Sequence, residues 1–436
     1  MKAVIIGAGP AGLFATYYLT KKGIHVVLID KGKRVEERKA GRGSELLHGI
    51  GGAGLFSDGK LNYSPDIGTN LIELIGREKT YQLMKEVEKI FEELGVKAKD
   101  PGDEVEEWMI KAAKEGIRYI PARQAHIGSE KLPVIIGKLE KILEDSGAEI
   151  RTEEEVLSID HKIKTIKTTR GEISFDRLLI APGRSGARWL NNIVNELKID
   201  FVYNPVDIGV RIEVPAMIME EITRVTWDPK IYINTPTYDD SVRTFCVSPY
   251  GYVVREKYKN FSLVNGHSRG DKMSENTNFA FLVKVSLTEP LENTNQYGEA
   301  IAFEATTIGG GKPIIQRLED LLRGRRSTWE RISKGFVNPT LKDVTPGDIA
   351  MALPYRFVKD ITEGLEKLNN LIKGVFSVQT LVYAPEIKFH GLRILTDEFL
   401  QTNVKDIFVA GDGAGLSRGI VGAASSGLLA AMGMEK

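Results

Sequence analysis

The sequence predicts an α/β protein in which a parallel sheet with flanking helices is interrupted by a second domain built on an antiparallel sheet. At the N-terminus, the apolar run Ala3–Ile6 leads into a glycine turn at 7–12, a helix-compatible stretch and a second apolar run, His25–Asp30. This order is typical of a βαβ unit with buried parallel strands. Beyond Pro205, strand patterns follow one another without helices between them, and Asp406–Ala410 then returns to a buried apolar run.

The remaining elements follow from periodicity in chain order. Apolar residues recur at helical spacing over 81–94 and 132–143, and Ser129 suits the N-cap of the second helix. A further helix is expected near Phe357–Leu371. The predicted strands are Glu149–Arg151, Val156–Asp160, Lys164–Thr168, Arg177–Ala181, Val206–Val214, Ile231–Asn234, Arg243–Val247, Gly251–Arg255 and Phe261–Asn265. We therefore expect one domain at 1–200 and 376–436, with a helical insertion at about 65–125, and an inserted substrate or cap domain at 201–375.

Composition restricts the class of protein. Lys and Arg number 59 and so do Asp and Glu, which removes the cationic surplus that nucleic-acid binding usually requires. The single cysteine, Cys246, cannot form an internal disulfide, so we expect a cytoplasmic protein. The uncharged segments 3–19 and 420–434 are too short to cross a membrane comfortably, and both are interpreted as buried elements. The six histidines show no ligand spacing, so no metal site is predicted.

The 44 glycines gather at 7–12, 41–59, 309–311 and 411–427. In the first group, Gly7, Gly9 and Gly12 form a G-x-G-x-x-G pattern between a strand and a helix, and Asp30 ends the next strand. Glycines there permit a tight turn and close approach of a pyrophosphate, whereas an acidic residue at this distance accepts hydrogen bonds from a ribose. NAD and FAD share this pattern, and a packing turn that binds nothing is the alternative.

A second motif favours FAD. The strand Asp406–Ala410 ends in Gly411-Asp412 and is followed by a glycine-rich loop and a helix of small residues. This resembles the second FAD fingerprint of the glutathione-reductase-like flavoproteins. The resemblance implies that Asp412 meets the ribityl or pyrophosphate portion and that the following helix, at Gly419, Ile420 and Val421, points its N-terminus at the flavin ring.

Other segments extend the resemblance over nearly the whole chain. Leu178–Gly183 stands where that superfamily has a strand ending in Ala-Thr-Gly, with Pro182 in place of Thr, and Val156 falls in the segment that usually lies against the adenine. The stretches 49–61, 206–211, 245–254 and 274–280 are similar to a family of uncharacterised FAD-dependent dehydrogenases. The resemblance implies a Rossmann-like FAD-binding domain. The expected cofactor-binding residues are Gly7, Gly9, Ala11, Gly12, Asp30, Lys31, Arg42, Gly52, Ala53, Val156, Ala181, Gly183, Gly411, Asp412, Gly419, Ile420 and Val421.

Candidates for catalysis lie in the glycine loop and before the last helix. Lys60 could stabilise reduced flavin or protonate a substrate, and Asp58 could serve as a base. An ordinary tight turn is the favoured interpretation of Asp58-Gly59, and a charged helix entrance is the alternative for Arg418 as an anion-binding residue. Cys246 is interpreted as a buried apolar residue rather than a nucleophile.

Glu386, Lys388 and His390 alternate along one predicted strand face, for which a solvated face is favoured over a substrate-lining one.

We therefore predict an FAD-dependent oxidoreductase that moves hydride between a small-molecule substrate and flavin N5. The alternatives are a flavin-dependent reductase of prenyl-type double bonds, an aromatic hydroxylase and a non-enzymatic flavin-binding redox sensor. Nucleic acid and an integral membrane segment are not expected, and homo-oligomerisation is left open.

Overall fold

The computed structural model describes residues 1–39, 47–57, 59–268 and 272–436. The chain forms two compact units, each containing more than one stretch of sequence. Unit 1 comprises residues 1–100, 122–204 and 391–436, and unit 2 comprises residues 101–121 and 205–390. Each unit has its own buried hydrophobic core.

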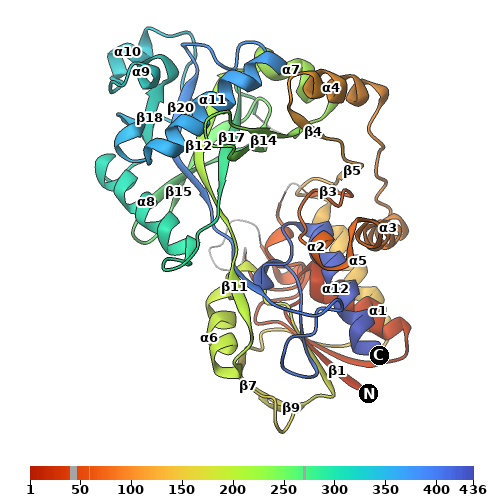
Figure 1. Ribbon diagram of the computed structural model, residues 1–436. Coiled ribbons are helices and arrows are strands. Elements are labelled where there is room, and N and C mark those ends of the chain that lie inside the picture. The colour runs from red at the N-terminus through yellow and green to blue at the C-terminus, as the bar shows by residue number, and fades with distance from the viewer. Residues whose placement is uncertain (40–46, 58, 269–271) are drawn as a thin grey trace. The chain divides into compact units, whose positions relative to one another are not determined.

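Unit 1 is built on a five-stranded parallel sheet in the order β22-β10-β1-β2-β6 (Figure 1). β1 (Lys2–Ile6) lies in its middle, and Val4 and Ile5 are fully buried, as expected for a strand covered on both faces. Helices α1 (Pro10–Lys21) and α12 (Ile420–Glu435) come from opposite ends of the chain and lie side by side (Figure 1). The sheet order places strands from three distant segments next to one another.

The other elements of unit 1 cover the sheet or extend it. Its strands are β2 (His25–Ile29), β3 (Lys60–Asn62), β5 (Gln124–His126), β6 (Glu149–Arg151), β7 (Val156–Asp160), β8 (Thr165–Thr168), β9 (Gly171–Ser174), β10 (Arg177–Ile180), β11 (Phe201–Tyr203), β21 (Leu392–Ile394) and β22 (Ile407–Val409). Its remaining α-helices are α2 (Ile72–Ile75), α3 (Arg77–Glu93), α5 (Leu132–Asp145) and α6 (Ala187–Leu197).

Unit 2 is built on an eight-stranded sheet in the order β19-β18-β20-β12-β17-β14-β13-β4. All described pairs in it are antiparallel except β18 with β19. Its strands are β4 (Arg118–Ile120), β12 (Val206–Pro215), β13 (Lys230–Asn234), β14 (Ser241–Ser248), β17 (Asn276–Val285), β18 (Ile314–Arg317), β19 (Thr345–Pro346) and β20 (Leu381–Lys388). A separate hairpin joins β15 (Tyr252–Lys257) to β16 (Ser262–His267).

Helices of unit 2 pack on the apolar face of this second sheet, except that the short helix containing Ile332 joins a smaller core with Ile315 and Tyr383. The α-helices of unit 2 are α4 (Asp103–Lys114), α7 (Ala216–Val225), α8 (Thr294–Ile308), α9 (Leu318–Leu322), α10 (Trp329–Ser333) and α11 (Tyr355–Leu371). α11 contributes Phe357, Ile361 and Leu365 to the same core as Ile208 and Val210 of β12. One sheet face is therefore apolar and covered, as strand alternation requires.

The α/β class is confirmed, with a parallel Rossmann-like region and a separate antiparallel sheet. Two local predictions are wrong. α7 lies between β12 and β13, because its apolar stripe packs on β12 and β17, so the strands beyond Pro205 are not joined by turns alone. Ser129 does not cap α5, since the N-cap residue is Lys131 and no side chain caps that helix.

The division into units differs from the predicted boundary at 376, since β20 pairs with β12 and β18 and so lies in unit 2. Residues 101–121 also lie in unit 2, because β4 pairs with β13 there.

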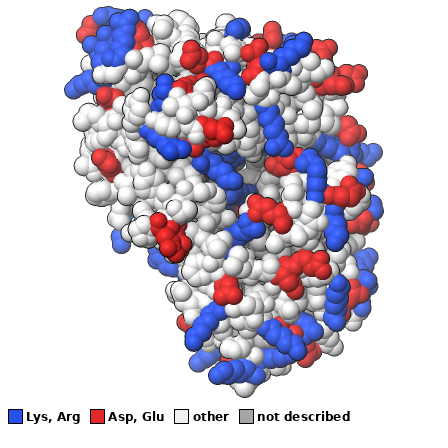
Figure 2. All heavy atoms as spheres, viewed as in Figure 1, with Lys and Arg blue, Asp and Glu red and all other residues white. Residues whose placement is uncertain are grey.

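On the face that Figure 2 shows, charges of both signs are interspersed, and Lys and Arg gather over α9 and α10. Among the described helices, none combines the length and apolar character needed to cross a bilayer. Within the same described residues, no three His, Cys, Asp or Glu side chains are grouped to hold a metal ion.

Candidate cofactor site

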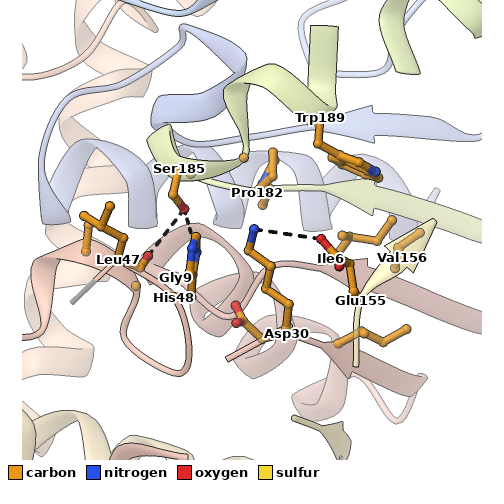
Figure 3. A pocket seen from close by; sticks show the side chains of 18 of the residues that line it. Ile6, Gly9, Asp30, Leu47, His48, Glu155, Val156, Pro182, Ser185 and Trp189 are labelled. Carbon is orange, nitrogen blue, oxygen red and sulfur yellow. Dashed lines mark hydrogen bonds and ion pairs between the residues drawn. The ribbon is translucent and has the colours of Figure 1, made fainter. Parts of the chain in front are cut away.

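A cleft opens in unit 1 at the carboxyl ends of β1, β2 and β10. In parallel α/β sheets this edge is where ligands bind. Figure 3 shows Ile6 at the end of β1, Asp30 directly after β2 and side chains of the segment after β10 around one space. The lining residues are Ile6, Gly7, Gly9, Ile29, Asp30, Lys31, Leu47, His48, Gly52, Ala53, Glu154, Glu155, Val156, Ala181, Pro182, Gly183, Arg184, Ser185, Gly186 and Trp189.

The three glycines of the first turn have different roles. A Cβ at Gly7 would lie 2.1 Å from the Ala181 carbonyl oxygen, and one at Gly12 would lie 1.9 Å from the Gly7 carbonyl oxygen. Both glycines are therefore needed for the chain to pack against itself. A Cβ at Gly9 would meet nothing closer than the Gly52 Cα, at 4.0 Å. Packing of the chain therefore does not require glycine at position 9. A side chain there would instead occupy space in the cleft.

The N-terminus of α1 opens toward this space. Gly9 is its N-cap and provides no side chain to satisfy the first N–H groups, and Pro10 begins the helix. The unsatisfied N–H groups and the helix dipole attract an anion.

Asp30 organises the loops that surround the cleft. Its Oδ2 accepts a hydrogen bond from the Ala8 N–H at 2.8 Å, and its Oδ1 accepts bonds from the Gly32 and Gly49 N–H groups, each at 2.8 Å. A carboxylate has about four lone-pair sites, so capacity remains for a ligand hydroxyl. Asp30 therefore ties the first turn to the glycine loop, a role that the sequence pattern does not reveal.

Arg38 stabilises the glycine loop around residues 49–54 through hydrogen bonds to its backbone. Its guanidinium donates to the Ile50 carbonyl at 2.6 Å and to the Gly52 carbonyl at 3.0 Å, and it lies 5.2 Å from the centre of the Phe56 ring. Gly52 has a φ of 62°, which a glycine adopts without strain.

His48 and Ser185 meet across the cleft although they are 137 residues apart, with 3.0 Å between His48 Nδ1 and Ser185 Oγ (Figure 3). Burial and the charge of Lys31 lower the pKa of His48, which favours the neutral imidazole at neutral pH. The Lys31 ammonium lies 3.9 Å from Glu155, so charges of both signs line this end.

The third predicted segment lies beside the first two. A Cβ at Gly413 would lie 2.5 Å from the Gly183 carbonyl oxygen, and one at Gly427 would lie 2.0 Å from the Ala11 carbonyl oxygen. A Cβ at Gly411 would lie 3.2 Å from the Ala11 Cβ. The motifs at 7–12, 181–183 and 411–427 therefore pack backbone against backbone.

Asp412 is held between these segments. Ser417 Oγ donates to it at 2.9 Å, and Arg184 Nε lies 3.5 Å from its other oxygen. Burial raises the pKa of Asp412, and the Arg184 charge and the Ser417 hydroxyl oppose that shift.

The structure brings together nine of the predicted cofactor residues in the lining of the cleft: Gly7, Gly9, Asp30, Lys31, Gly52, Ala53, Val156, Ala181 and Gly183. Ala11, Gly12, Gly411 and Asp412 lie directly behind them, while Gly419, Ile420 and Val421 lie at the start of α12. Ile420 is close to the glycine loop, since a Cβ at Gly54 would lie 3.3 Å from its Cγ1. Their individual roles stay predictions.

The catalytic candidates are not gathered in the cleft lining. Lys60 is half-buried in β3, opposite His126 of β5, and Arg418 is exposed, with its backbone N–H bonded to the Gly68 carbonyl. Asp58 and Arg42 lie outside the described residues.

The structure also tests the predicted exposure of Glu386 and the predicted burial of Cys246 in unit 2. Glu386 is fully buried and forms an ion pair with Arg211, so the solvated-face interpretation of Glu386 is wrong. Cys246 is only half-buried in β14, so the expectation of a buried cysteine is wrong.

Sequence reasoning missed several lining residues, among them Leu47, His48, Glu154, Glu155, Arg184, Ser185 and Trp189. The position of Arg184 and Ser185 directly after Gly183 was an available signal. His48 and Trp189 carry no local motif, since only folding brings them to the cleft.

The residues present fit FAD. The open cradle at Gly9 and the uncapped helix N-terminus suit a pyrophosphate, and Asp30 suits a ribose. Trp189 Nε1 is buried and has no hydrogen-bond acceptor among the described residues, so one donor is left for a ligand at the Val156 end of the cleft.

Two family models match separate stretches of the chain. Residues 2–128 match the family described as FAD dependent oxidoreductase, and residues 205–388 match the family described as FAD-dependent protein, C-terminal domain-like. An uncharacterized protein of Clostridium beijerinckii is 26% identical, over 98% of this chain and 79% of its own length.

Solved structures with similarity along the chain include glycine oxidase from Geobacillus kaustophilus, 13% identical, with a TM-score of 0.39 and coverage of 99% of this chain and 94% of that one. L-proline dehydrogenase from P. horikoshii is 13% identical, with a TM-score of 0.41 and coverage of 100% and 94%.

The family matches favour an enzyme over a non-enzymatic sensor, and the cleft has the cradle that its cofactor requires. The chain is an FAD-dependent oxidoreductase, with its N-terminal segment in the first family match and the main part of unit 2 in the second.

Proposed function

We propose that this oxidoreductase is a dehydrogenase or reductase that moves hydride between a small organic substrate and flavin N5. FAD supplies the two-electron chemistry when it is bound. The observation that carries the proposal is a cleft with an open cradle at Gly9, behind which the glycine segment 411–427 packs against the segments 7–12 and 181–183. The closer likeness to the uncharacterised, glutathione-reductase-like dehydrogenases stays a prediction.

The chain itself supplies binding and orientation. The first N–H groups of α1 stabilise the pyrophosphate charge, and Asp30 accepts from a ribose while it holds the glycine loop in register. Arg38 fixes the carbonyls at 50 and 52, so that the loop keeps its distance from Gly9. Arg184 and Ser417 orient the Asp412 carboxyl at the junction of the motifs.

The assignment is tested by two glycine substitutions that differ in mechanism. Gly9→Ala adds a methyl group to open space in an extended backbone, so we expect a folded apoprotein whose affinity for FAD falls at least tenfold. Gly12→Ala forces a clash with the Gly7 carbonyl and is expected to destabilise unit 1 itself by about 1–3 kcal/mol. FAD titration and urea unfolding of the apoproteins separate the two effects.

Gly137→Ala in α5 serves as the control, because its Cβ would meet only Val35, at 3.8 Å, away from the cleft lining. Unchanged FAD affinity in Gly9→Ala would show that the cradle is misassigned. A protein that stays colourless with added FAD would refute the cofactor. Photoreduced protein that no quinone or unsaturated metabolite reoxidises faster than buffer would refute hydride transfer.

A further inference from the structure

Charged residues lie on one face of the unit 2 sheet, opposite its apolar core. Asp207 and Arg211 alternate along β12 with Ile208 and Val210, which belong to the core on the other face. In the pairing of β12 with β20, Asp207 is opposite Lys388, which places both side chains on the charged face. Burying charged groups costs free energy unless each is paired, so the partners of these side chains decide how much charge is left unbalanced.

Two cations on this face share one carboxylate. Arg211 Nη1 donates to both oxygens of Glu386, at 3.0 and 3.1 Å, and Lys388 Nζ lies 2.9 Å from the same carboxylate. Arg211 and Glu386 are fully buried, whereas Lys388 keeps part of its side chain accessible. Because Arg211 alone balances the negative charge of Glu386, Lys388 adds a positive charge that this carboxylate does not balance.

Two further cations extend the group. Arg243 donates to Asp207 at 2.7 Å, and Lys230 donates to Asp228 at 2.7 Å. We call Arg211, Lys230, Arg243 and Lys388 the cationic cluster; its four charges face the three carboxylates of Asp207, Asp228 and Glu386.

Neighbouring groups do not cancel the surplus. His390 also contacts Asp207, at 3.0 Å, and Lys284 of β17 is opposite Asp207 in the strand register. Although burial raises the pKa of Asp207, the charges of Arg243 and His390 hold it well below its ordinary value, so this carboxylate is ionised. Glu213 is not counted among the three carboxylates, because burial raises its pKa and its carboxyl oxygens accept hydrogen bonds from Tyr383 and Thr340.

Three cations of the cluster surround one aromatic ring. The Lys230 Nζ lies 5.1 Å from the centre of the Phe245 ring, the Arg243 guanidinium carbon 4.7 Å and the Lys388 Nζ 6.0 Å. The three side chains come from β13, β14 and β20, so the sheet itself holds like charges close together. Their mutual repulsion falls when an anion binds among them.

The backbone beside Phe245 is irregular. Cys246 has a φ of 47°, which is uncommon for a residue with a side chain, and the pairing of β14 with β17 shifts between Phe245 and Ser248. The Cys246 carbonyl accepts from Arg211 Nη2 at 2.5 Å. Bulges and strained residues of this kind cluster at binding sites, where they aim side chains.

We propose that the cationic cluster binds the carboxylate of a small organic acid, with Phe245 beside the ligand's apolar part. Each ammonium carries three N–H donors, and Lys388 and Lys230 each have one ion-pair partner among the described residues, so donors remain for the ligand. The binding site stands on unit 2 alone; its identification with the substrate site rests on the proposed function. The substrate class is then an organic carboxylate.

The test uses the full-length, FAD-loaded protein, with benzoate as the probe and benzamide as its neutral counterpart. Isothermal titration should show benzoate binding that weakens with added salt, and much weaker benzamide binding. Lys388→Met removes the surplus charge and leaves Glu386 paired with Arg211, so the fold is expected to persist. We expect at least a tenfold loss of benzoate affinity, with flavin content unchanged.

Lys359→Met is the matched control, because Lys359 pairs with Glu363 on α11, which packs on the apolar face of the same sheet. It should bind benzoate as the wild type does. Equal affinity of Lys388→Met and wild type, or equal affinity for benzoate and benzamide, would overturn the proposal. A flavin-loaded protein that binds no benzoate would refute the carboxylate site alone, whereas an empty, colourless protein would refute the proposed function.

Discussion

Asp360 shows what burial does to a single carboxyl group. It lies on α11, accepts a hydrogen bond from Thr235 at 2.8 Å and is close to Asp240. Burial, together with Asp240, raises its pKa from 3.8 to about 6. The folded protein therefore binds this proton more tightly than the unfolded chain, and the stability associated with it is lost as the pH rises through about 6.

We predict that Asp360→Asn is more stabilising at about pH 7 than at about pH 4, because the amide carries no charge that must be buried. Urea unfolding of both proteins across this range measures the difference. Asp240→Asn should lessen the pH dependence by removing the neighbouring charge. Parallel stability profiles for wild type and Asp360→Asn would contradict the prediction.

At the scale of the element, alanine substitutions at two helix glycines should change the stability of unit 1 in opposite directions. Gly427 lies where α12 crosses α1, and a Cβ there would lie 2.0 Å from the Ala11 carbonyl oxygen. Gly137 lies within α5 with its nearest neighbour at 3.8 Å. Gly427→Ala should destabilise unit 1 by about 1–3 kcal/mol through overpacking, whereas Gly137→Ala should stabilise it by about 0.5–1 kcal/mol through helix propensity.

Chemical denaturation of the two apoproteins measures these changes, and circular dichroism checks that helix content is kept. Destabilisation by both substitutions to the same extent would show that close contact with α1 is not what requires glycine at 427.

For the whole molecule, two separate cores predict two responses to ligand. The FAD cleft is lined by unit 1 alone, so FAD should raise the unfolding temperature of unit 1 and leave the transition of unit 2 in place. The gain is about 2.7 kcal/mol when free FAD is a hundredfold above its Kd. Trp189 is the one tryptophan of unit 1, so its fluorescence should report that transition.

Calorimetry with and without FAD measures the unfolding temperature of each unit. In Trp189→Phe, the fluorescence change that accompanies unfolding of unit 1 should disappear, while the calorimetric transition of unit 1 remains. An equal shift of both transitions would show that the two units unfold as one.

The sequence by itself determined the α/β class, the three glycine motifs and the cofactor, because turns with positive φ and buried parallel strands demand particular residue types at fixed spacing. Tertiary structure alone decided the meeting of His48 with Ser185, the place of Trp189 in the cleft lining with its Nε1 buried, and the burial of Glu386 against Arg211. These pairs are separated by more than a hundred residues, and no local periodicity encodes them. The cationic cluster was equally invisible, since β12 and β17 must join β20 to β14 and β13 before the three cations meet around Phe245.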